Sequence, residues 1–221
     1  MPDGTDKCCP DPSEYTDTIM VATLAELRER DDASIGDQFV HLDGVSWEDY
    51  ERLLDMRGDR SAPRICYLEG TVEIMSPSRE HEGIKSWIGR LVETYCLFAG
   101  IECRTYGSWT LKERPKKRGV EPDECYFFGT ELTERPHLAI QVIWTSGGMN
   151  ELDIYRKLGV REVWIWRHGR IQAHVLREEK YHAVDRSDVL PGIDLEQLAS
   201  FLDRPTTSQA IRDYRAGRDA G

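Results

Sequence analysis

Residues 138–144 read LAIQVIW, and this stretch decides the fold because Gln141 is its one polar residue. A strand with apolar side chains on both faces is buried on both faces, which is typical of the centre of a sheet. On such a strand, Gln141 shares one face with Ala139 and Ile143. A buried amide needs partners for two donors and an acceptor. Gln141 is therefore either bonded to a neighbouring strand or part of a functional site.

Strand and helix patterns alternate on both sides of this run. The strand patterns are FVHL (39–42), the hairpin RICYLEGTVEIMS (64–76), one or two strands in IECRTYGSWTLKE (101–113), 124–128, REVWIW (161–166), IQAHVL (171–176) and YHAV (181–184). The helical patterns are WEDYERLLDM (47–56) after the N-cap Ser46, 79–99 between Ser78 and Gly100, NELDIYRKL (150–158) and 193–202. Helices between buried strands predict a mixed α/β fold, with a mixed central sheet flanked by helices.

The length of 221 residues fits one domain with extensions. We predict an N-terminal extension over 1–37, partly disordered and with a short helix at 21–32, a domain over 38–202 and a polar tail over 203–221. The sequence contains no run of about 18 apolar residues, and its polar start has no apolar core, so neither a membrane span nor a secretory signal is expected. The predicted location is cytoplasmic.

Composition limits the classes of function. The chain has 29 basic and 40 acidic residues, a formal net charge of −11, which argues against a protein that coats nucleic acid through bulk charge. An enzyme whose acidic groups hold a metal against phosphate remains compatible with that charge. The six cysteines include no CxxC pair, so we expect reduced thiols in the core and no zinc site.

Four polar positions stand out beside Gln141. Asp123 follows Pro122 at the mouth of a predicted strand, where a carboxylate suits a hard cation or simply a turn. Glu151 opens the helix 150–158, where an acidic side chain is favourable in any case, but the helical pattern turns it towards the strand of Gln141. His81 and Lys85 lie one turn apart at the start of the long helix, in a functional site or on an exposed first turn. Weaker candidates are the acidic residues Glu73 and Glu82.

Taken in order, these positions resemble a known pattern. The chain is similar to the Uma-type restriction endonuclease family, within the PD-(D/E)XK nuclease superfamily, from about Phe39 to Leu202. The matching segments are VSWEDYERLL (45–54), EGTVEIMSPSREHE (69–82), YGSWTLKE (106–113), EPDECYFF (121–128), LAIQVIWTSGG (138–148) and LDIYRKLGVREVWIW (152–166).

The resemblance implies a metal site where two strands diverge. Asp123 takes the place of the first acidic residue of the superfamily, and His81 matches the family's histidine on the long helix. Gln141 stands where the family usually has Glu, with the carbonyl of Val142 as a further ligand. Glu151 stands where the family usually has Lys. The implied ligands are therefore Asp123, Gln141, Val142 and His81, and the implied cofactor is weakly bound Mg²⁺ or Mn²⁺.

The two departures leave three readings open. In the first, Glu151 supplies the missing carboxylate and Lys85 or Lys157 supplies the cation. In the second, the site is a Gln variant of the motif. In the third, the site is inactive. These readings lead to two hypotheses: a Mg²⁺-dependent endonuclease that cleaves DNA, with catalytic residues Asp123, Gln141, Glu151, His81 and Lys85, or a silent nuclease-like fold that acts as a binding or scaffold protein. A third is an α/β protein without an active site.

The partner predicted for the nuclease is DNA, and a homodimer is compatible with the fold by analogy alone. A basic loop over 112–118 would contact phosphates, or it is simply a solvated loop.

Overall fold

The computed structural model describes residues 36–131, 133–144 and 148–219. Its strands are β1 (Gln38–Leu42), β2 (Arg64–Leu68), β3 (Thr71–Ser76), β4 (Cys103–Thr105), β5 (Leu111–Glu113), β6 (Arg118–Val120), β7 (Glu124–Phe128), β8 (Leu138–Val142), β9 (Glu162–Arg167), β10 (Arg170–Arg177) and β11 (Lys180–Val184). Its helices are α2 (Trp47–Arg57), α3 (Arg79–Ala99), α4 (Glu151–Leu158), α5 (Leu195–Ser200) and α6 (Thr207–Asp219), with a short 3₁₀ turn at Arg114–Lys116. The predicted helix at 21–32 and nearly all of the predicted extension lie outside the described residues.

The strands form two sheets. The first sheet has the order β1-β3-β2-β6-β5 and is antiparallel throughout. The second has the order β11-β10-β9-β8-β7-β4 and is mixed, because β8 and β9 are parallel and the other pairs are antiparallel. The predicted mixed α/β fold is confirmed. The division of the strands between two sheets was not predicted.

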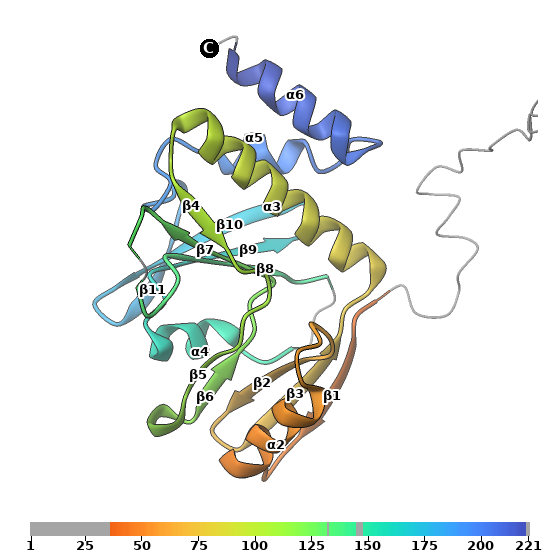
Figure 1. The fold of residues 1–221 in the computed structure, drawn as a ribbon, viewed down its shortest axis with the longest axis vertical. Coiled ribbons are helices and arrows are strands. Elements are labelled where there is room, and N and C mark those ends of the chain that lie inside the picture. The colour runs from red at the N-terminus through yellow and green to blue at the C-terminus, as the bar shows by residue number, and fades with distance from the viewer. Residues whose placement is uncertain (1–35, 132, 145–147, 220–221) are drawn as a thin grey trace, which may run out of the picture. The chain divides into compact units, whose positions relative to one another are not determined.

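Strand β8 lies inside the second sheet, as its apolar run predicted, and all five of its residues are buried. Parallel strands need a crossover connection, and α4 supplies it between β8 and β9. Leu138, Ile140 and Val142 pack in the core that includes α3, whereas Ala139 packs in the core that includes α4. The two helices therefore lie on opposite faces of this sheet (Figure 1).

Helix α3 begins and ends at the residues that the sequence indicated. The hydroxyl of Ser78 accepts a hydrogen bond from the backbone N–H of His81, and Gly100 closes the helix in the left-handed conformation, with φ 64°. The first turn of α3 is thereby fixed against the hairpin β2–β3, which places His81 in the interior.

The segment Glu121-Pro122-Asp123 carries the chain from the first sheet into the second. It joins β6 to β7, and Pro122 has no N–H with which to continue either ladder. Glu121 is tied to the first sheet, because its carboxylate accepts from the N–H of Ile65 at 3.0 Å and pairs with Arg57 at 2.6 Å. Asp123 is tied to the second sheet through its N–H, which donates to the carbonyl of Ile140 at 3.0 Å. The strands therefore separate into two sheets at this segment.

The loop predicted over 112–118 was wrong, because residues 111–120 form the hairpin β5–β6 around the 3₁₀ turn. Four of its five basic residues are paired with acidic residues: Lys112 with Glu51, Arg114 with Glu48, Lys116 with Glu113, and Arg118 with Glu69 and Asp153. Five basic residues in seven suggested a solvated loop, because partners that are distant in sequence could not be seen. Arg118 is in fact buried.

The C-terminal region is helical, and it packs against the rest of the domain. The helix predicted over 193–202 is shorter, Leu195–Ser200, with Asp194 as its N-cap. The predicted tail forms α6, which lies beside α3 (Figure 1) and buries Ala210 and Tyr214.

We predict that the Glu121→Ala substitution lowers the free energy of unfolding by about 3 kcal/mol, because it leaves the Arg57 charge and the N–H of Ile65 without a partner. Urea unfolding followed by circular dichroism measures this loss. Glu51→Ala is the control, since its pair with Lys112 is exposed on both sides and contributes less than ~1 kcal/mol. Equal losses in the two variants would contradict the role assigned to Glu121.

Candidate active site

Asp123 is fully buried, and donors from three elements contact its carboxylate. Oδ1 pairs with Nη1 of Arg64 and lies 2.9 Å from Nε2 of His81, whereas Oδ2 accepts from the N–H of Val142 at 2.5 Å. Burial alone would raise the pKa of Asp123, but the positive charge of Arg64 and the hydrogen bond from His81 outweigh it and lower the pKa. Asp123 is therefore ionised, and both of its oxygens are engaged.

His81 lies between two carboxylates. Its Nδ1 is 2.9 Å from Oδ2 of Asp37, and Oδ1 of the same carboxylate accepts from the N–H of Ser78 at 2.8 Å. Burial lowers the pKa of His81, but the hydrogen bonds to Asp123 and Asp37 raise it to about 9. His81 is then an imidazolium at neutral pH, and both ring nitrogens donate. Each ring nitrogen of His81 thus lies against a carboxylate.

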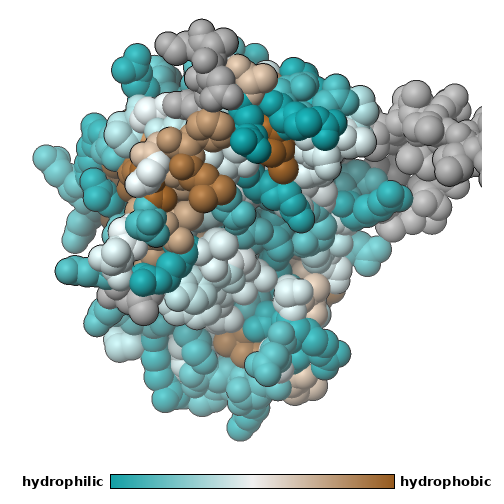
Figure 2. Space-filling view, turned by 45° about the horizontal axis from the view of Figure 1, so that its top comes forward, coloured by the Kyte–Doolittle hydropathy of each residue, from teal (hydrophilic) through white to brown (hydrophobic). Residues whose placement is uncertain are grey.

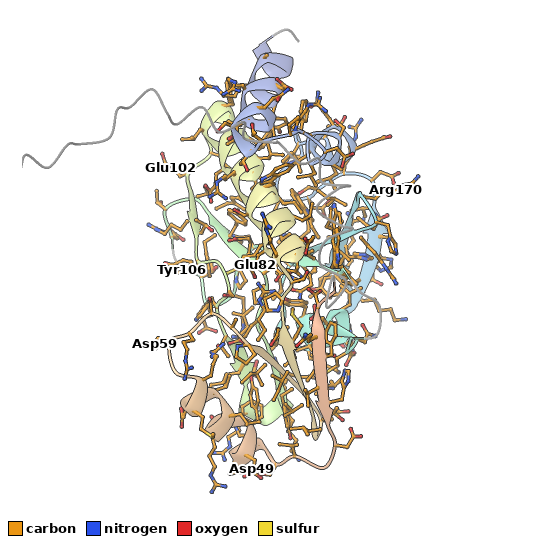
Figure 3. All side chains as sticks on the ribbon, turned by 90° about the vertical axis from the view of Figure 1, so that its right-hand side faces the viewer. Asp49, Asp59, Glu82, Glu102, Tyr106 and Arg170 are labelled. Atoms are coloured by element: carbon orange, nitrogen blue, oxygen red, sulfur yellow. The ribbon has the colours of Figure 1, made fainter. Side chains whose placement is uncertain are left out.

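Arg64 was not among the candidates from the sequence. In the structure it is only 2% exposed and contacts Asp123. Its Nη1 lies 2.8 Å from Nε2 of His81, so that two cations share Oδ1 of Asp123. Its Nη2 donates to Glu82 at 2.6 Å, and Glu82 also accepts from Lys85 at 3.2 Å. Glu82 lies at the start of α3 (Figure 3). Lys85 is therefore linked to Asp123 through Glu82 and Arg64. An arginine inside the apolar strand RICYL was the signal, because a buried charge needs a partner.

Gln141 bonds to helix α4 and not to a neighbouring strand. Its Nε2 donates to Oε1 of Glu151 at 3.0 Å, and its Oε1 accepts from the hydroxyl of Tyr155 at 3.1 Å. Glu151 thus faces the strand of Gln141, as the helical pattern predicted. Among the hydrogen bonds of the described residues, none joins Gln141 to Asp123. The two positions share β8, because Asp123 accepts from the N–H of the next residue, Val142.

Glu151 carries the least satisfied carboxyl group of the site. Its Oε2 is buried without a hydrogen-bond partner among the described residues. Burial, followed by the negative charges of Asp123 and Glu73, raises the pKa of Glu151 well above its usual value. A buried acid beside two others is stable only when it is protonated or when a cation joins it.

Glu73 and Cys66 complete the site from the hairpin β2–β3. Potential ligand atoms of Cys66, Glu73 and Glu151 all lie within 4.8 Å of one another. Glu73 is 2% exposed and accepts from the N–H of Met149 at 2.6 Å. Glu73 was only a weak candidate for the site in the sequence, and Cys66 was predicted to lie in the core. Their partner on α4, Glu151, lies about 80 residues away along the chain.

A divalent cation fits the part of the site formed by Glu73 and Glu151, but not the part formed by Asp123. The unpartnered oxygen of Glu151 beside Glu73 is a suitable environment for a cation. The carboxylate of Asp123 is already occupied by Arg64, His81 and Val142. The structure therefore brings Asp123, His81 and Val142 together, places Gln141 with Glu151, and links Lys85 through Glu82. Lys157 is exposed on the far turn of α4.

A model of a family of restriction endonucleases, described as putative, matches residues 47–203, from α2 to the end of α5. The chain belongs to the Uma2 family. The predicted resemblance is thereby confirmed. The Uma2 chain is also similar to the crystal structure of a putative nuclease of DUF820 from Anabaena variabilis, with 12% identity and a TM-score of 0.50, over 67% of this chain and 96% of that one. This likeness supports the fold. A search of curated proteins found no match.

The Uma2 chain presents a mainly hydrophilic surface in the view of Figure 2, with a few apolar areas. None of the described helices combines the length and the apolar composition needed to cross a membrane.

We predict that the unfolding free energy falls as pH rises from 6.5 to about 9, because folding raises the pKa of His81. The stabilisation is complete below the unfolded pKa of 6.5 and is lost as the pH passes the folded value, by about 3 kcal/mol at most. His81→Asn should flatten this dependence in urea unfolding at a series of pH values. His174→Asn is the control, since burial lowers the pKa of His174 and its effect lies below pH 6.5. An unchanged slope in His81→Asn would refute the assignment.

Proposed function

We propose that this chain is a divalent-metal-dependent endonuclease that hydrolyses phosphodiester bonds in DNA. One observation carries the proposal: the buried Glu73 and Asp123 and the partly buried Glu151 come from separate elements to one site of a chain that belongs to the Uma2 family. Acidic side chains at such a site can bind a metal ion, and the bound ion can contact a phosphate group although the chain has a net charge of −11.

The residues divide into two groups in this proposal. Glu73 and Glu151 would hold the ion, proposed as Mg²⁺ or Mn²⁺, with Gln141 orienting Glu151. When bound, such an ion polarises the phosphate and lowers the pKa of a water molecule. Asp123 fixes Arg64 and His81 at the edge of this group. A ligand role for Asp123 itself would require one of these cations to move away from it.

Positive charge for the transition state comes from the hairpin and α3 in this proposal. Arg64 and Lys85 both contact Glu82, which is 44% exposed, whereas the exposed fraction is 2% for Arg64 and 14% for Lys85. A preorganised cation of this kind stabilises the charge that develops on phosphate. Lys85 is the better candidate for contact with substrate, because Arg64 is buried against Asp123.

Contacts with the DNA backbone are proposed for the hairpin β5–β6. Lys112, Arg114 and Lys116 are paired with acidic residues, so phosphates must compete with those carboxylates. Exposed pairs are weak and are screened by salt, so the competition is feasible for Lys112 and Arg114. A homodimer remains part of the proposal by analogy with nucleases that cut both strands.

A second function is favoured by a specific observation. Gln141 and Glu151 stand where the family pattern has Glu and Lys, and they bond to each other. Both oxygens of the Asp123 carboxylate are also engaged by internal donors. Both features are expected of a silent nuclease-like fold that is retained for binding.

We predict that the purified chain cleaves DNA with Mg²⁺ or Mn²⁺, and that Glu73→Gln lowers the rate by ~10²–10³. The reason is the loss of an anionic group from the proposed ion site. Conversion of supercoiled plasmid, with the ions present and after chelation, is the measurement. Lys157→Ala is the control and should cleave normally. No cleavage by the folded chain with either ion would contradict the nuclease proposal.

The double variant Gln141→Glu/Glu151→Lys separates the two functions. It restores the family pattern at two positions that are already in hydrogen-bond contact. Cleavage that appears only in the double variant shows that the native site is catalytically silent. Cleavage by the native chain rejects the hypothesis of a silent fold. Calorimetric titration with Mg²⁺ and Mn²⁺, on the native chain and on Asp123→Ala, shows whether Asp123 takes part in binding the ion.

A further inference from the structure

Cys66, Glu73 and Glu151 form a group of potential metal ligands that we call the thiol–carboxylate cluster. One ligand atom of each lies within 4.8 Å of the other two. Cys66 on β2 and Glu73 on β3 are direct partners in the antiparallel register, so their side chains lie on the same face. Glu151 reaches this face from the first turn of α4. Three elements thus direct their donors to one point.

Two of the three residues of the cluster are buried and Glu151 is partly buried, and one oxygen of the cluster has no hydrogen-bond partner among the described residues. The exposed fraction is 5% for Cys66 and 2% for Glu73. Glu151 accepts from Gln141 through Oε1, but its Oε2 is buried and lacks a partner in the part of the chain that the structure describes. An unpaired buried oxygen costs stability, and a second carboxylate beside it adds repulsion. A cation between these groups removes both costs.

Neighbouring groups orient the donors. Nε2 of His41 lies 2.7 Å from Oε2 of Glu73, and the N–H of Met149 donates to the same oxygen. Hydrogen bonds to the ligands are a general feature of metal sites, where they fix the orientation of each donor.

The sulfur determines which class of metal fits. Mg²⁺ prefers six oxygen ligands in an octahedral arrangement, whereas Zn²⁺ accepts thiolate and carboxylate ligands in a tetrahedral one. Three protein ligands with a free fourth position are typical of catalytic zinc sites. The lack of a CxxC pair argued against zinc in the sequence, but here carboxylates take the places of further thiols.

We propose that the thiol–carboxylate cluster binds a divalent cation of the zinc class through the thiolate of Cys66 and one oxygen each of Glu73 and Glu151. The thiol proton passes to solvent as the metal–sulfur bond forms. The inference rests on the same buried site as the proposed nuclease. It concerns which cation is bound, and it holds whether or not the chain cleaves DNA.

Cobalt provides the test, because a thiolate bound to Co²⁺ gives a charge-transfer absorption band that oxygen ligands do not give. The full chain is prepared without a histidine tag, stripped with a chelator, and carries Cys8→Ser/Cys9→Ser so that this adjacent pair does not bind metal. We expect one Co²⁺ per chain with the charge-transfer band, displacement by Zn²⁺, and no displacement by excess Mg²⁺. Cys66→Ala in this background should abolish the band.

Cys125→Ala is the matched control, because Cys125 is also a buried strand thiol but lies outside the cluster. It should retain the band. Glu151→Gln keeps the size of the side chain and removes one anionic ligand, so we expect it to weaken Zn²⁺ binding at least about tenfold. Circular dichroism confirms that each variant is folded, and Glu151→Gln keeps the test valid if Cys66→Ala does not fold.

Three results would overturn the inference: no band in the folded background chain, a band of equal strength in Cys66→Ala, or displacement of Co²⁺ by Mg²⁺. A band without DNA cleavage rejects the nuclease proposal and supports the zinc-class site. Cleavage with Mg²⁺ in a chain that gives no band supports the nuclease and rejects the zinc-class site.

Discussion

The structure depends on one buried carboxylate at the point where the chain passes between two sheets. An ionised Asp123 without solvent is stable only if donors surround it, because water no longer solvates its charge. The donors are Arg64 on β2, His81 on α3 and the N–H of Val142 on β8. The hairpin, the long helix and the central strand are therefore held at fixed positions by the electrostatic requirement of a single residue.

This requirement also constrains the chemistry of the site. Arg64 and His81 place two positive charges beside Asp123. The acidity that remains for a cation lies at Glu73 and Glu151. Gln141 on β8 is neutral, whereas Glu151 carries a carboxyl group on α4. The hydrogen bond between their side chains joins the central strand to this helix.

Much of the fold could be predicted, because local patterns specify local structure. The apolar run of β8, the N-caps Ser46 and Ser78 and the C-terminal Gly100 mark elements that the structure confirms. The hairpin β5–β6 was missed, because its basic residues suggested a loop. Their acidic partners lie mostly on α2 and in the β2–β3 turn, far away in the sequence.

Part of the candidate site could also be predicted from local patterns. His81, Asp123, Gln141 and Glu151 could be selected because each is a polar residue at a defined place in an element or at its start. Arg64, Asp37 and Cys66 were not selected. Arg64 begins an apolar strand, which was a local signal, but nothing local distinguishes an aspartate before a strand or a buried thiol from ordinary residues. Their significance depends on which groups they face across the interior.

By itself, the sequence determined most of the helices and strands and the membership of the Uma2 family. Hydrophobic periodicity and capping act over a few residues, so one sequence is enough to show them. Only the tertiary structure decided that the strands divide into two sheets, that Arg64 and His81 occupy Asp123, and that Cys66, Glu73 and Glu151 meet. Those outcomes depend on Coulombic interactions and burial between residues that are far apart along the chain, which no local pattern can encode.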